Sequence, residues 1–95
     1  MKLVWTERSR AHLTALHDHI AAEDPAAATG VATRIVDLVG TLLREHPQSG
    51  RPGRVAGTRE LVITGTPYLV AYETDDDTIT ILAVLHSARR WPSRF

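Results

Sequence analysis

The chain has no cysteine among its 95 residues. A disulfide framework and a thiolate metal or catalytic site are therefore excluded. It also has no long apolar run. The apolar run at the N-terminus is too short for a signal peptide, and no segment is expected to cross a bilayer. These absences predict a soluble protein of the cytoplasm with no membrane association.

Lysine is nearly absent, because Lys2 is the only lysine among 11 basic residues, and 11 acidic residues bring the net charge to zero. Bulk charge therefore does not indicate general nucleic-acid binding. The arginines instead gather locally, in residues 51–59 and 89–94, and the planar guanidinium suits phosphate or carboxylate partners. A length of 95 residues predicts one domain, residues 1–95.

The first half of the chain reads as a short strand followed by a helical hairpin. Residues 2–5 form the expected strand, Thr6 is a good N-cap, and the first helix is expected to end near Glu23. Asp24 and Pro25 then start a second helix. The apolar positions that recur at helical spacing are Leu13, Leu16 and Ile20, and then Val31, Ile35, Leu38 and Leu42.

The second half alternates with a period of two after a segment, residues 47–57, that is rich in proline and glycine and is expected to be loop. Three strands with short connections, ending with residues 78–85, predict an antiparallel meander. The predicted class is α+β with the order β-α-α-β-β-β, a helical hairpin packed on one face of a small, mainly antiparallel sheet. In the last strand Ile79, Ile81, Ala83 and Leu85 are expected to face one way and Leu82, Val84 and His86 the other.

The last strand passes directly into a basic and aromatic segment. His86 ends the strand, and Arg89, Arg90 and Trp91 follow before Pro92 stops regular structure. We expect function to lie at this end of the sheet. The structural alternatives are that His86 binds a carbonyl or packs on Trp91, and that Trp91 covers the open end of the sheet.

Neither a metal nor a cofactor is expected. His12 and His19 share a face of the first helix, but no third ligand falls at a spacing that completes a zinc site with them. The glycines of residues 50–57 lack the strand-before, helix-after context of a phosphate-binding loop.

Three short segments carry a resemblance to a known family: GTRELVI at 57–63, TPYLVAYE at 66–73 and ILAVLHSARRWP at 81–92. With the helical hairpin and the leading strand, they resemble the ParE/RelE superfamily of bacterial type II toxins over essentially the whole chain. The resemblance implies the RelE/ParE toxin fold and a toxin–antitoxin module of the kind that also stabilises plasmids. It further implies hetero-oligomers with a cognate antitoxin whose C-terminal segment folds on the toxin.

Members of the superfamily act in one of two ways. RelE-like members cleave mRNA in the ribosome without metal, and such an endoribonuclease would here use Arg59, Glu60, His86 and Arg89. ParE-like members inhibit DNA gyrase and are not expected to be enzymes in their own right. Leu69 stands where the ribonuclease branch has an arginine, which favours the ParE branch.

The same resemblance leads to two predicted binding surfaces. The target-binding residues are expected to be His86, Arg89, Arg90 and Trp91. The antitoxin-binding residues are expected to be Arg54, Arg59, Val62, Val70 and Leu82, with acidic antitoxin groups meeting the arginines and an apolar segment covering the rest.

Overall fold

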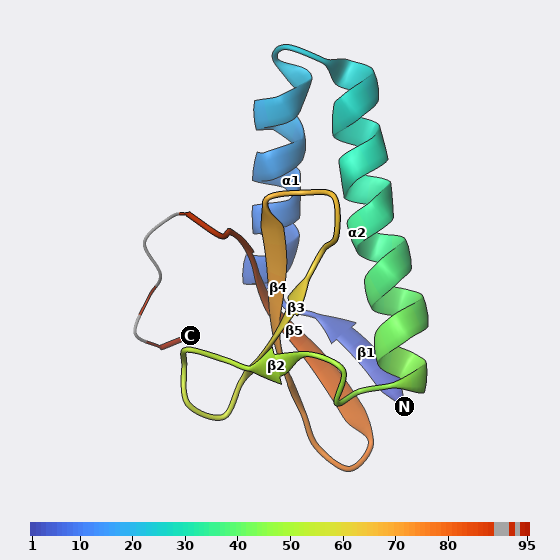
Figure 1. Ribbon diagram of the computed structural model, residues 1–95, viewed down its shortest axis with the longest axis vertical. Helices are drawn as coiled ribbons and strands as arrows, with labels where there is room; N and C mark the ends of the chain where they lie inside the picture. The colour runs from blue at the N-terminus through green and yellow to red at the C-terminus, as the bar shows by residue number, and fades with distance from the viewer. Residues whose placement is uncertain (89–91, 93) are drawn as a thin grey trace.

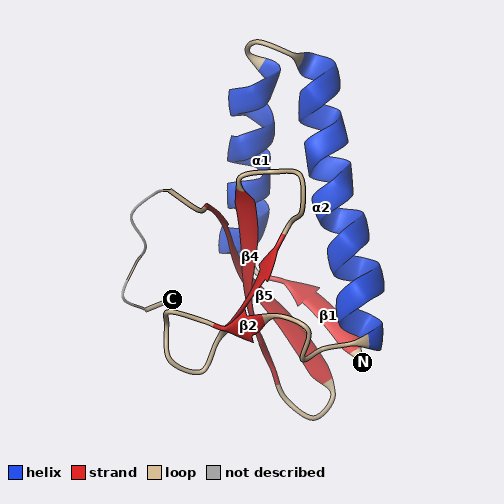
Figure 2. Ribbon diagram, in the orientation of Figure 1, coloured by secondary structure: helices blue, strands red, loops and turns tan. Residues whose placement is uncertain are grey.

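The computed structural model describes residues 1–88, 92 and 94–95 (Figure 1). Its elements are β1 (Lys2–Trp5), α1 (Glu7–Ala21), α2 (Pro25–Glu45), β2 (Arg51–Pro52), β3 (Arg59–Val62), β4 (Tyr68–Thr74) and β5 (Thr78–His86). The strands form one mixed sheet in the order β1-β5-β4-β3-β2, in which only the β1–β5 pair of the described chain is parallel (Figure 2). The predicted α+β class and element order are confirmed, and β2 is an addition within the segment expected to be loop.

The two helices run antiparallel, and the tip of their hairpin extends beyond the sheet (Figure 1). The Thr6 side chain caps α1 by accepting the Ser9 N–H at 3.1 Å, and it also donates to the Ile81 carbonyl at 2.8 Å. Asp24 caps α2 through the Ala27 N–H, with Pro25 at the first helical position. Local capping chemistry thus fixes both helix starts where the sequence predicted them, although α1 ends at Ala21, two residues before Glu23.

One core lies between the hairpin and the sheet. Its buried members are Leu16 of α1, Ile35, Val39 and Leu43 of α2, and Leu61, Ile63, Val70, Tyr72, Ile79, Ile81 and Val84 of the sheet and the residue after β3. By length and composition alone α2 is also apolar enough to cross a membrane, contrary to the sequence-based expectation. Four residues of α2 are buried in the structure, Ala28, Ile35, Val39 and Leu43, whereas Val36 on another face is 42% exposed.

The central strand β5 changes phase halfway along its length. Ala83 of β5 pairs with Ala71 of β4, whereas Ile81 pairs with Tyr72, the next residue of β4. Leu82 therefore has no pairing partner on β4. This β-bulge puts Val84 on the same core-facing side as Ile79 and Ile81. The expected single face of Ile79, Ile81, Ala83 and Leu85 is therefore wrong, because a one-residue insertion reverses every side chain after it.

Candidate functional site

The connection between α2 and β3 is anchored by two side chains of the sheet. The hydroxyl of Tyr72, which is fully buried, donates to the Pro47 carbonyl at 2.9 Å and accepts the Gly50 N–H at 2.8 Å. Arg59 donates to the Gly50 carbonyl at 2.7 Å. Desolvation raises the pKa of Tyr72 further above its ordinary value, and the neutral phenol is the form that can donate to Pro47. Arg59, one of the residues that a ribonuclease would use, thus donates to the backbone carbonyls of Gln48 and Gly50.

Glu60 anchors the next part of the same connection. Its carboxylate is 2% exposed, receives Arg51 Nη2 at 3.2 Å and the Arg54 backbone N–H at 2.8 Å, and lies 3.7 Å from Arg54 Nε. Both arginine side chains are about half exposed, whereas the Glu60 side chain is withdrawn from solvent. This arrangement orients two arginines at the surface and leaves the carboxylate little access to a substrate proton.

Glu60 and His86 lie on opposite faces of the sheet. Glu60 is in register with Ala71, which pairs with Ala83, on the side away from the helices. His86 pairs with Tyr68 and follows the core residue Val84 by two positions, on the side of the helices. The Cα atoms of Glu60 and His86 are two strand spacings apart across the sheet and three residues apart along β5, which gives a separation of about 14 Å. The structure does not bring the two acid–base candidates of the ribonuclease alternative together.

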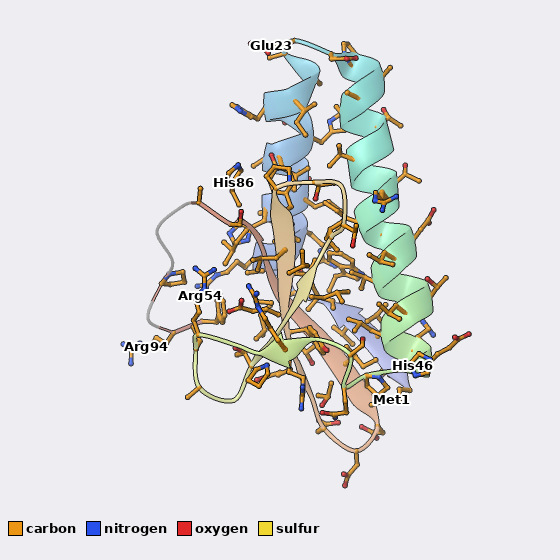
Figure 3. All side chains as sticks on the ribbon, in the orientation of Figure 1. Met1, Glu23, His46, Arg54, His86 and Arg94 are labelled. Carbon is orange, nitrogen blue, oxygen red and sulfur yellow. The ribbon has the colours of Figure 1, made fainter. Side chains whose placement is uncertain are left out.

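His86 lies beside α1 (Figure 3). It lines a pocket of about 390 Å³ between that helix and the ends of β4 and β5. The ring of Tyr68 meets the His86 ring edge to face, with centroids 5.5 Å apart. The Nδ1 atom of His86 accepts the Ala88 N–H at 3.1 Å, and the Ser87 N–H donates to the Pro67 carbonyl at 2.8 Å. These contacts fix the start of the C-terminal segment, whereas the predicted residues Arg89, Arg90 and Trp91 lie outside the described residues.

The predicted antitoxin-binding residues divide by exposure. Val62 is 49% exposed and Leu82 is half-buried, but Val70 is fully buried in the core. Val70 therefore cannot supply exposed apolar surface in this fold, because the pleat of β4 turns it toward the helices. Arg54 is exposed yet ion-paired with Glu60, and Arg59 is half-buried against carbonyls.

Two features of the site were missed in the sequence. The Tyr72 hydroxyl bridge was not predicted, although a tyrosine on a core-facing strand has a hydroxyl that needs a partner. His12 was considered from the sequence as a metal ligand, but its Nδ1 accepts the Val84 N–H at 3.2 Å and joins α1 to β5. Among residues 1–88, 92 and 94–95, no group of three or more histidines or carboxylates is placed to hold a metal ion.

The His12 contact predicts a dependence of stability on pH. Desolvation, followed by the charge of Arg8, lowers the pKa of His12 from 6.5. Below pH 6.5 the unfolded chain therefore binds a proton that the folded chain does not, and stability falls as the pH decreases through 6.5 toward the folded pKa. We expect His12→Asn, which retains an acceptor and does not titrate, to flatten this part of the curve. Urea unfolding at a series of pH values measures it, and equal slopes in both proteins would contradict it.

Comparison with known proteins agrees with this fold. Residues 3–91 match the family of ParE toxins of the type II toxin–antitoxin system parDE. The toxin-family protein Y4kP of Sinorhizobium fredii is 41% identical over 91 residues, which cover 96% of this chain and 93% of that protein. Toxin RelE2 of Caulobacter vibrioides is 38% identical over 88 residues, covering 93% of this chain and 97% of the relative.

A solved structure of the chromosomal ParDE toxin–antitoxin system of P. aeruginosa superposes with a TM-score of 0.80 at 30% identity. The match covers 88% of this chain and 92% of that one. The chain therefore belongs to the ParE toxin family of type II toxin–antitoxin systems, in the ParE/RelE superfamily.

Proposed function

We propose that this toxin arrests growth in the cytoplasm by binding and inhibiting DNA gyrase, as a ParE-like protein without hydrolytic activity of its own. The observation that carries the proposal is the position of the ribonuclease candidates. Metal-free RNA cleavage requires a base, an acid and phosphate-binding cations around one phosphodiester. Glu60 is buried in ion pairs, Arg59 binds carbonyls, and His86 lies on the other face of the sheet.

Leu69 supports the same conclusion. It occupies the position of the arginine found in the ribonuclease branch, and it is 1% exposed and pairs with Leu85. A buried leucine at this point leaves no cation on β4 to meet a phosphate. The proposed target-binding set remains His86, Arg89, Arg90 and Trp91, of which His86 is the described member.

A toxin of this family has an antitoxin partner, and we propose that the antitoxin's C-terminal segment binds near the outer edge of β3. In the described chain β2 pairs with β3 only at Arg59 and Glu60. Leu61 and Val62 therefore have no strand on the outer side of β3 among the described residues, and Val62 is about half exposed. An added strand would use this edge, and its acidic residues would meet Arg51 and Arg54.

The relative named RelE2 makes mRNA cleavage the second candidate to test. Purified toxin added to gyrase and relaxed plasmid is expected to block supercoiling. The same toxin added to ribosomes and a defined mRNA is expected to leave the RNA intact. Codon-specific RNA cuts with normal supercoiling would replace the gyrase proposal with the ribonuclease one.

The Glu60→Gln variant separates a catalytic from a structural role. We expect it to lower the free energy of unfolding by about 1–3 kcal/mol, since the amide keeps the shape but loses charge-assisted bonds to two arginines. Growth arrest should fall only as far as the folded fraction falls. Glu73→Gln, at an exposed acid of β4, is the matched control and should change neither property. Complete loss of toxicity in a fully folded Glu60→Gln protein would indicate catalysis by Glu60.

A further inference from the structure

The pocket between α1 and the ends of β4 and β5 carries a further inference, and its residue His86 also belongs to the proposed target-binding set. Its polar lining is His12, His19, Tyr68 and His86, and its apolar walls include Leu16 and Val84, both largely buried. The volume of about 390 Å³ lies within the range of small-molecule sites. Three of the five histidines of the chain therefore line one pocket.

Hydrogen bonding fixes the tautomers of two of these imidazoles. Nδ1 of His12 accepts the Val84 N–H at 3.2 Å, and Nδ1 of His86 accepts the Ala88 N–H at 3.1 Å. A nitrogen that accepts carries no proton, so the proton of each neutral ring is on Nε2. Each ring therefore offers one N–H donor.

This donor pattern selects among ligand classes. A transition metal would need an unprotonated Nε2, which these two tautomers do not provide. A cation would need acceptors, yet the pocket lining contains no carboxylate. A phosphate dianion would require strong positive charge, and neither lysine nor arginine lines the pocket. A single carboxylate can accept hydrogen bonds from two N–H donors, and Arg8 is close enough to His12 to add favourable potential.

We propose that this pocket binds a carboxylate attached to a compact apolar body, with His12 and His86 as hydrogen-bond donors and Leu16 and Val84 as apolar contacts. The carboxylate has two possible sources, a free aromatic acid or an acidic side chain of a partner protein. Both present the same group to the same donors.

Titration of the purified toxin with benzoate, followed by NMR of the histidine ring protons, tests the proposal. At about 0.3 kcal/mol per non-hydrogen atom, benzoate is expected to bind with a dissociation constant on the order of ten millimolar. Benzoate is expected to shift the resonances of His12 and His86 and not those of His46, which lies beyond the end of α2. Benzyl alcohol, which keeps the ring but lacks the charge, is expected to bind about tenfold more weakly.

An N-acetylaspartate amide tests the side-chain source, and tighter binding of either acid identifies the source.

Two variants remove the donors and retain the structural bonds. His12→Asn and His86→Asn each keep an acceptor near the position of Nδ1 but lack the Nε2 donor, and each is expected to raise the benzoate dissociation constant about fivefold. His46→Asn is the control, and thermal melts establish that all three proteins are folded. Equal binding of benzyl alcohol, no histidine shifts at tens of millimolar benzoate, or unchanged affinity in both folded variants would overturn the proposal.

Discussion

Gly50→Ala is expected to destabilise the protein by about 3 kcal/mol or more, which corresponds to a fall of roughly 10–20 °C in the melting temperature of a domain of this size. A Cβ atom at Gly50 would lie 2.6 Å from the Tyr72 hydroxyl oxygen and 2.9 Å from the Glu60 carbonyl oxygen. The hydroxyl cannot retreat without leaving Pro47 and the Gly50 N–H without their bonds. The substitution therefore combines overpacking with the loss of buried hydrogen bonds.

Gly40→Ala is the matched control for this prediction. Gly40 lies in the interior of α2, and a Cβ there meets no neighbouring atom within 4 Å. Alanine should stabilise the helix by about 0.5–1 kcal/mol because it restricts the unfolded chain. Thermal melts of both variants measure the effects. Gly50→Ala melting with the wild-type protein would show that the connection after α2 does not depend on its contact with Tyr72.

Trp91→Ala, or Arg89→Ala combined with Arg90→Ala, is expected to abolish growth arrest and leave antitoxin binding intact. Tryptophan and arginine most often dominate binding interfaces, tryptophan through buried area and arginine through forked hydrogen bonds. These residues lie outside the described part of the structure, but the segment that leads to them is held by Ser87 and His86. A target-binding role therefore predicts a loss of toxicity without a loss of stability.

The alternative role of Trp91, as a cover for the sheet, predicts a different pair of results. Its removal would then lower the melting temperature, and toxicity would fall only with the folded fraction. Circular dichroism melts and a gyrase supercoiling assay on the same variants separate the two roles. Variants that melt normally and inhibit gyrase fully would exclude this segment as the target-binding surface.

Much of the fold followed from local signals in the sequence. Thr6, Asp24 and Pro25 fix the helix starts through capping chemistry that depends on neighbouring residues alone. The short connection after β4 also depends on local chemistry: Asp75 accepts the N–H groups of Asp77 and Thr78, and these bonds lower its pKa. The bulge at Leu82 was not predictable, because an apolar run on a strand buried on both faces does not reveal a change of phase.

The site was harder to predict from the sequence because its side chains contact residues that are distant along the chain. From the sequence alone, Glu60 and Arg59 resemble catalytic groups. In the structure they bind residues 48–54, which pairing of β2 with β3 places beside them. His12 and His86 are 74 positions apart and line one pocket through the placement of α1 on the sheet. Long-range register of this kind has no local sequence signal.

Induction of the toxin alone in cells tests the gyrase proposal when mRNA 5′ ends and gyrase-linked DNA breaks are mapped in the same samples. A toxin that binds gyrase and does not cleave RNA should produce DNA breaks at gyrase sites, while the mRNA ends match those of uninduced cells. New codon-specific mRNA ends in the absence of gyrase-linked breaks would contradict the account.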